Sequence, residues 1–77
     1  MAKASQIKER MEVLASDGEH VGTVDHIEGD GSIRLTKNDP AADGQHHIIP
    51  PVWVANVDDH VRLSKSSADV FRNWVAI

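Results

Sequence analysis

The chain has 77 residues, no cysteine, and twelve Asp and Glu residues against eight Lys and Arg residues, which gives a net charge of −4 at pH 7. Its length allows one small domain, and such a domain buries only about 60% of the surface of its unfolded chain. The missing cysteines exclude disulfides and thiolate metal sites, and the negative charge opposes general attraction to phosphate backbones or anionic lipid.

The N-terminal stretch MAKASQIKER lacks the apolar segment of a signal peptide, and no apolar run reaches the roughly 20 residues that span a bilayer. We therefore expect a cytoplasmic protein without membrane insertion. We also expect a single domain over residues 1–77, in which residues 1–5 form a loose tail.

Short apolar, β-prone runs separated by Gly, Asp, Asn and Pro predict a mainly β fold. Asp17-Gly18 and Asp30-Gly31 supply two tight turns, because Asp-Gly favours the backbone conformations that a hairpin requires. A brief helical turn is expected over residues 6–10. Strands are predicted over residues 11–15, 20–28, 32–37, 46–49 and 60–63.

The second predicted strand departs from strict alternation of apolar and polar residues. Val21, Val24 and Ile27 are its apolar residues, and a regular strand would place Val24 on the face opposite the other two. A bulge or sharp bend at Gly22 would reset the phase. Small closed barrels require strands that bend in this way.

Two prolines follow the fourth predicted strand. Pro50 and Pro51 end it, because proline cannot donate a hydrogen bond to a strand ladder. We expect Trp53 and Val54 on a single helical turn that closes one end of the core, with the Trp53 ring in the core.

A C-terminal helix is predicted over residues 66–76. Ser66 starts it, because Ser followed by Asp three residues later resembles a capping box. Two roles remain open for Phe71 and Trp74: they either complete the core of the monomer or anchor a contact with a second copy or another protein. The apolar stripe of this helix consists of Phe71, Trp74 and Val75, with Ala68 and Val70 at its edges.

Two strings of this chain resemble parts of PRC-barrel domains. SDGEHVGTVDHIE at residues 16–28 is similar to their opening hairpin, in which an Asp-Gly turn precedes a Val-Gly-x-Val strand. HHIIPPVWVANVDDHVRL at residues 46–63 resembles their closing half, with an Ile-Pro step, a helical turn and a final strand. Together with KNDP at residues 37–40, these strings most resemble a group of short stand-alone bacterial proteins of unknown function within that superfamily.

The resemblance covers about residues 7–64. It implies a small PRC-barrel-like (SH3-like) β-barrel, which agrees with the five or six short antiparallel strands and the C-terminal α-helix expected from the pattern. The wider family includes the cytoplasmic barrel of the photosynthetic reaction-centre H subunit and the C-terminal domain of a ribosome maturation factor. These relatives imply docking on proteins rather than chemistry, and no catalytic residue carries over.

We therefore expect a non-catalytic protein–protein interaction module that is not an enzyme and uses no cofactor. Self-association is expected, with a dimer as the simplest homo-oligomer, together with an unidentified protein partner. One alternative, implied only by the maturation factor, is a ribosome-associated assembly or maturation accessory factor.

Another alternative is a histidine-based binder of a metal or small ligand, for which His46 and His47 are the candidate residues. Neighbours on a strand point to opposite faces, so this pair cannot bind one ion without help from His20, His26 or His60. Structural or surface roles for the histidines are the favoured interpretation.

Two other patterns of charged residues give weaker indications of a binding site. A calcium loop over Asp39, Asp43 and Gly44 is rejected, because Ala41 and Pro50 stand where ligands are needed. A basic patch is conceivable, but scattered solubilising charge is the favoured interpretation, and one Phe with no Tyr leaves few side chains for base stacking, so direct nucleic-acid binding is not expected. The residues of that conceivable patch are Arg34, Lys37, Arg62 and Lys65.

Overall fold

The computed structural model describes residues 7–42 and 44–77, and in them the chain forms seven short strands, one α-helix and two 3₁₀ turns. The predicted tail at residues 1–5 lies outside the described residues. The described part of the predicted helical turn, residues 7–10, contains a turn and no helix. The elements are β1 (Glu12–Leu14), β2 (His20–Ile27), β3 (Ile33–Leu35), η2 (Pro40–Ala42), β4 (His47–Ile49), η3 (Pro51–Trp53), β5 (Val54–Val57), β6 (Val61–Leu63), α1 (Ser67–Asn73) and β7 (Val75–Ala76).

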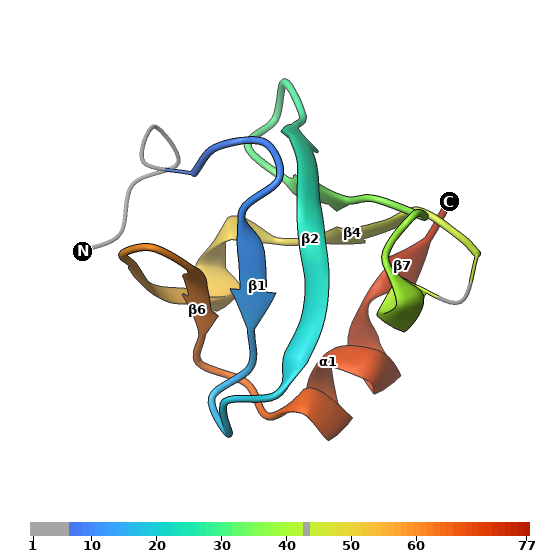
Figure 1. The fold of residues 1–77 in the computed structure, drawn as a ribbon. Helices are drawn as coiled ribbons and strands as arrows, with labels where there is room; N and C mark the ends of the chain where they lie inside the picture. Colours follow the sequence, from blue (N-terminus) through green and yellow to red (C-terminus); the bar gives the residue numbers. More distant parts are fainter. Residues whose placement is uncertain (1–6, 43) are drawn as a thin grey trace.

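All seven strands join in one curled sheet with the order β5-β6-β1-β2-β3-β4-β7. Figure 1 shows β2 running through the centre of the molecule, with β1 and β6 on one side, β4 crossing behind it, and α1 and β7 on the other side. Neighbouring strands pair antiparallel except β1 and β6, which are parallel. The prediction of a mainly β, barrel-like fold with a C-terminal helix is confirmed, whereas the count of five or six strands, all antiparallel, is wrong.

The first additional strand is β5, which pairs with β6. Trp53 lies on the 3₁₀ turn η3, as predicted, and its half-buried ring packs against the core. Val54, by contrast, belongs to β5 rather than to the helical turn. Once the Pro-started turn ends, Val54 and Val57 can pair with Leu63 and Val61 and pack against the core.

The C-terminal helix begins as predicted and ends earlier than predicted. Ser66 is its N-cap, and the Ser66 hydroxyl accepts a hydrogen bond from the backbone N–H of Asp69 at 3.3 Å. The helix ends at Asn73, so the predicted range of residues 66–76 is wrong. Trp74 already has extended backbone angles (φ −69°, ψ 160°).

The second additional strand, β7, explains the early helix end. Val75 pairs with Ile48, and Ala76 pairs with His47, so β7 covers the edge that β4 would otherwise leave open. The backbone N–H of Ile77 donates to the carbonyl of His46 at 2.9 Å. These long-range hydrogen bonds replace the last turn of helix, and they suit a β-branched residue such as Val75.

Two irregularities bend β2. Val13 pairs with Gly22, but Leu14 pairs with His20, so Val21 is an extra residue in β2. This bulge changes the alternation of inward and outward side chains, as expected near Gly22. It brings both Val21 and Val24 into the core.

The second irregularity lies at Asp25 of β2. Val24 pairs with Leu35 and His26 with Arg34, which leaves Asp25 as an extra residue. Bulges increase the local twist of a strand, so two of them in one eight-residue strand allow a short sheet to curl over its own core.

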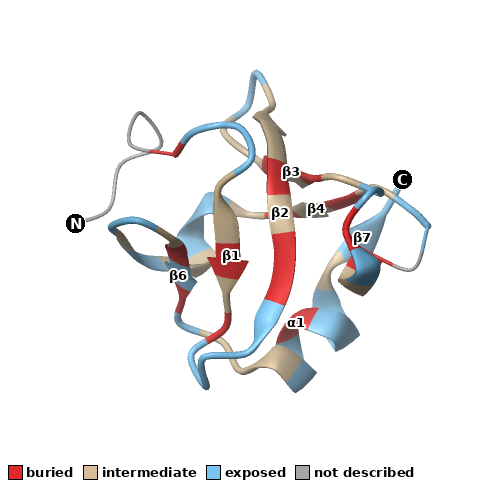
Figure 2. Ribbon diagram, in the orientation of Figure 1, coloured by how far each residue is buried: buried red, intermediate tan, exposed pale blue. Residues whose placement is uncertain are grey.

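The core lies inside the curl and is made of aliphatic side chains. In Figure 2 the buried segments run along the middle of β1, β2 and β6 and reach one side of α1. Val70 is the buried residue of α1, although it was expected only at the edge of the apolar stripe. The buried core residues are Ile7, Val13, Ala15, Val21, Val24, Ile33, Leu35, Ile49, Val61, Leu63 and Val70.

Gly22→Ala should destabilise the fold. A Cβ at this position would lie 2.9 Å from Cδ1 of the fully buried Leu35, so the core must shift to admit it. We expect a loss of about 1–3 kcal/mol in the free energy of unfolding, measured by urea denaturation.

Gly29→Ala is the matched control, because a Cβ there meets nothing within 4 Å and the backbone is not left-handed. We expect it to change the free energy of unfolding by less than about 1 kcal/mol. Equal effects of the two substitutions would contradict the close packing of Leu35 on Gly22.

Candidate functional site

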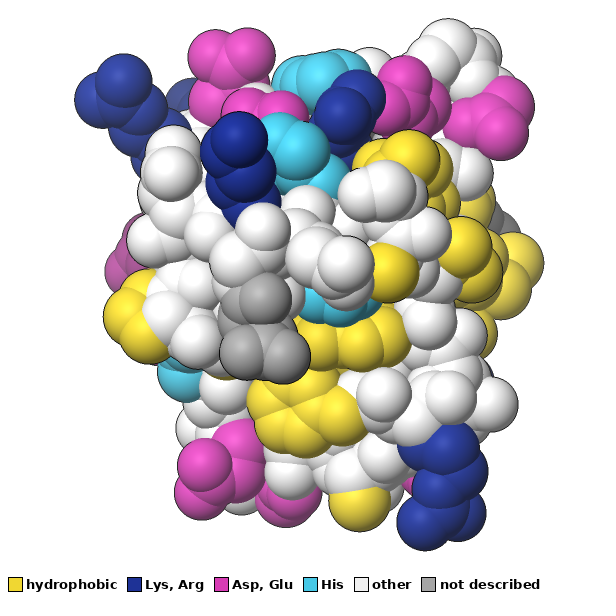
Figure 3. All heavy atoms as spheres, turned by 90° about the vertical axis from the view of Figure 1, so that its right-hand side faces the viewer, with side chains coloured by type: hydrophobic (Ala, Val, Ile, Leu, Met, Phe, Trp, Pro, Cys, Tyr) yellow, Lys and Arg dark blue, Asp and Glu magenta, His cyan; other side chains and the backbone are white. Residues whose placement is uncertain are grey.

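Four side chains from the end of the chain form what we term the C-terminal apolar surface: Phe71 of α1, Trp74 at its C-cap, Val75 of β7, and Ile77. Phe71, Val75 and Ile77 are 44%, 62% and 59% exposed, and Trp74 is half-buried. Figure 3 views the side of the molecule that carries α1 and β7, and hydrophobic side chains gather in the middle of that face, with charged ones above and below. Large apolar side chains grouped on a surface are typical of interaction sites.

Contacts among three aromatic rings hold this surface against the rest of the fold. The Trp74 ring stacks on His47 with 3.7 Å between ring centroids and 11° between planes. Phe71 meets Trp74 edge-on at 5.0 Å and 70°. His47 is only 5% exposed, so the Trp74 ring packs against a buried residue of β4. Phe71, which is 44% exposed, contacts Trp74 from the solvent side.

The two candidate ligand histidines lie in different surroundings. His47 is buried under Trp74, while the Nδ1 atom of half-buried His46 lies 3.1 Å from the backbone N of Lys37 and 3.3 Å from the carbonyl oxygen of Leu35. Within residues 7–42 and 44–77, no group of three or more His, Asp or Glu side chains is arranged to hold a metal ion.

A chain of alternating histidines and carboxylates links β1 to its neighbours, and no sequence pattern predicted it. Nδ1 of His20 lies 2.8 Å from Oε2 of Glu12, and Nε2 of the same ring lies 2.6 Å from Oδ2 of Asp39. The other oxygen of Glu12 lies 3.1 Å from Nε2 of His60. Two ring nitrogens can both donate to carboxylates only when the imidazole is protonated, so this geometry favours the imidazolium form of His20.

The pKa of His20 follows from this arrangement. Burial by itself would lower the pKa, but the hydrogen bonds and negative charges of Glu12 and Asp39 together outweigh burial and raise it above the ordinary value of 6.5. The folded chain therefore holds a proton on His20 at a pH where the unfolded chain has released it.

Asp39 is the buried end of this chain, with 7% of its surface exposed. Burial would raise its pKa, but the hydrogen bonds from the Thr23 hydroxyl (2.5 Å), the Ala41 backbone N–H (2.8 Å) and His20 outweigh burial and lower it. Asp39 thus joins η2 to β2 as a satisfied, ionised carboxylate. Its neighbour in the rejected calcium pattern, Asp43, lies outside the described residues.

Both arginines of the basic patch considered from the sequence lie beside carboxylates. Arg34 of β3 lies 3.3 Å from Glu28 and 3.7 Å from Asp25. Arg62 lies on β6, which two strands separate from β3 in the sheet order, and its Nε donates to Asp58 at 3.0 Å. The ammonium of Lys65 lies 5.4 Å from the centre of the Trp53 ring. Carboxylates therefore screen both arginines.

We expect the stability of the protein to fall as the pH rises through the folded pKa of His20. Because that pKa lies above the unfolded value, the stabilisation by protonated His20 is fully present below about pH 6 and is lost at higher pH. Urea denaturation at about pH 6 and about pH 8.5 gives the free energy of unfolding at each pH. The His20→Gln substitution should reduce the difference between these two free energies. His46→Gln is the control and should retain it, whereas an unchanged difference in His20→Gln would contradict the assignment.

Trp74→Ala should lower the free energy of unfolding by about 1–3 kcal/mol, because it removes a half-buried ring that covers His47. Phe71→Ala, which removes a more exposed ring, should cost less than about 1 kcal/mol. Both values come from chemical denaturation at one protein concentration. A Trp74→Ala variant as stable as the unsubstituted chain would show that the stack does not contribute to folding.

Comparison with known proteins supports the predicted relationship to short bacterial proteins of unknown function. A search of curated proteins finds no match to the chain. In the described part of the chain, no helix has the length and apolar character to cross a membrane. A family model described as uncharacterized protein conserved in bacteria (DUF2171) matches residues 7–71. The chain therefore belongs to this bacterial family, which agrees with the predicted group of short bacterial proteins of unknown function.

Proposed function

We propose that the protein is a non-catalytic, PRC-barrel-like interaction module that forms a homodimer through the C-terminal apolar surface. The observation that carries this proposal is the exposure of Phe71, Val75 and Ile77 beside the outer edge of β7. A surface of this kind loses apolar contact with water when a second copy covers it.

The edge of the sheet supports a second copy as the occupant. Among the described strands, β7 stands at one end of the order and pairs with β4 alone. Its other edge has no partner among residues 7–42 and 44–77, and an antiparallel pairing with the same strand of another copy would use it. A two-fold axis between the two strands would use the same residues on both copies, as closed dimers do.

Dimer formation would stabilise a fold whose core is small. A chain of this length buries a modest share of its surface on folding. A partner that binds the folded form adds stability that grows with the logarithm of the partner concentration once this exceeds the dissociation constant. Phe71 and Val75 are more exposed than the apolar residues that line the inside of the sheet, so their burial between two copies would add to that share.

Phe71→Ser tests the surface. We expect the unsubstituted chain to pass from monomer to dimer over the range of about 1 μM to about 1 mM in sedimentation equilibrium, and Phe71→Ser to raise the dissociation constant at least about tenfold. Val52→Ser is the matched control, because Val52 is 83% exposed on η3, outside the C-terminal apolar surface. It should leave the dissociation constant unchanged. A chain that stays monomeric throughout the range, or a Phe71→Ser variant that dimerises normally, would overturn the proposed dimer.

A further inference from the structure

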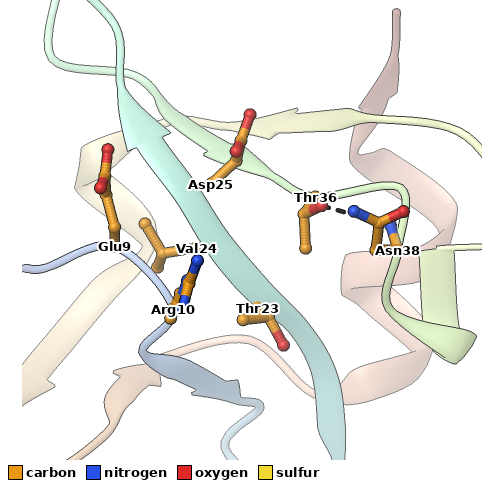
Figure 4. A pocket seen from close by; sticks show the side chains of 7 residues that line it. All are labelled: Glu9, Arg10, Thr23, Val24, Asp25, Thr36 and Asn38. Atoms are coloured by element: carbon orange, nitrogen blue, oxygen red, sulfur yellow. Dashed lines mark hydrogen bonds between the residues drawn. The ribbon is translucent and has the colours of Figure 1, made fainter.

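A polar hollow of about 360 Å³ lies over the outer face of β2, and it contains no residue of the C-terminal apolar surface. Figure 4 shows β2 as its floor, with the segment before β1 on one side and the segment after β3 on the other. This volume is at the lower end of the range for small-molecule sites. The lining residues are Glu9, Arg10, Thr23, Val24, Asp25, Thr36 and Asn38.

Backbone hydrogen bonds hold one wall of the hollow to the floor. The N–H of Arg10 donates to the carbonyl of Val24 at 2.7 Å, and the N–H of Val24 donates to the carbonyl of Met11 at 2.9 Å. These bonds extend the pairing of β1 with β2 and place Glu9 and Arg10 over the floor.

The other wall is held in the same way. The N–H of Thr36 donates to the carbonyl of Thr23 at 2.9 Å, and the N–H of Asn38 donates to the Thr36 hydroxyl at 3.2 Å. The Thr23 hydroxyl is itself bound to the buried carboxylate of Asp39. The hollow is therefore formed before any ligand enters, which lowers the cost of binding.

Arg10 has the one positive φ angle among non-glycine residues of the described chain, +70°. A left-handed backbone is unfavourable for arginine, and such strain persists where the surrounding structure imposes it, commonly at ligand sites. The strain accompanies the turn that brings Glu9 and Arg10 to the rim of the hollow.

The charges of the hollow are separated along its length. In Figure 4 the carboxylates of Glu9 and Asp25 lie toward one end, and Arg10 and Thr23 lie toward the other. Asp25 is already in contact with His26 (3.3 Å) and Arg34 (3.7 Å). Glu9 and Arg10 form no ion pair with any described residue, so the hollow offers one uncommitted charge of each sign.

From this arrangement we propose that the polar hollow binds a small zwitterion of the α-amino-acid type. Arg10 binds the carboxylate of the ligand, because a guanidinium matches the two oxygens of a carboxylate. Glu9, with Asp25 across β2 from it, faces the ammonium group. Thr36 and Asn38 supply a hydroxyl and an amide that can hydrogen-bond the carboxylate oxygens and the remaining N–H donors of the ammonium group.

Amide chemical shifts of the full-length protein test the site, with separate titrations of L-alanine, glycine betaine, choline, acetate and glucose. Alanine should produce saturable shifts of the amides of Thr23, Val24, Thr36 and Asn38. Glycine betaine should do so more weakly, because its quaternary nitrogen carries no N–H donor. Acetate and choline, which each carry one charge, should bind at least about tenfold more weakly than alanine, and glucose should not bind. The absence of saturable shifts, or equal binding of choline or acetate, would overturn the proposal.

Arg10→Gly separates binding from folding. Glycine accepts the left-handed backbone, so this variant should unfold at a higher temperature, yet it should bind alanine at least about tenfold more weakly. Glu9→Gln should also weaken binding, without the gain in thermal stability. Lys65→Gln removes a cation outside the hollow and should bind normally. An Arg10→Gly variant with unchanged affinity for alanine would overturn the role assigned to Arg10.

Discussion

The bending of β2 is the constraint on which the rest of the structure depends. A flat sheet of such short strands could not surround a core, but the extra residues Val21 and Asp25 bend β2 twice. Gly22 makes the first bend compatible with close packing, because the Leu35 side chain occupies the place where a Cβ would lie. The curl then brings β6 beside β1 and lets β3 and β4 cross behind β2.

The same bends determine what lies on the outside of β2. Thr23 stands between the two extra residues, half-buried, and its hydroxyl reaches the carboxylate of Asp39. Asp39 in turn meets His20, at the start of β2, so η2 is tied to the strand at two points. One strand thus provides the wall of the core, the anchor of the histidine–carboxylate chain and the floor of the polar hollow.

Local sequence signals were sufficient for the elements that depend on neighbours in the chain. Gly18 and Gly31 have the positive φ angles that the Asp-Gly turns predict, and Ser66 caps the helix. The end of that helix could not be predicted in the same way. Val75 takes a partner, Ile48, that lies 27 residues earlier in the chain, and the sequence near Val75 contains no sign of it.

The site shows the same division between local and long-range information. Phe71 and Trp74 are conspicuous in the sequence as aromatic side chains at the end of the chain, and in the structure their rings meet edge-on. Glu12, His20 and Asp39 were not predicted as a group, because they come from two different strands and a loop, and a spacing pattern within one element cannot bring them together. Only the pairing of β1 with β2 and the return of η2 bring them together.

Two features of the molecule lower the stability of the folded monomer. Arg10 holds a left-handed backbone that glycine would hold at lower cost, and Phe71, Val75 and Ile77 expose apolar surface that polar side chains could replace. Proteins depart from locally favourable choices mainly where function requires it. The two departures lie on different parts of the barrel, one beside the outer face of β2 and one beside the edge of β7, and they differ in chemistry. Strain beside uncommitted charge favours a small polar ligand, whereas apolar surface beside a strand edge favours another polypeptide.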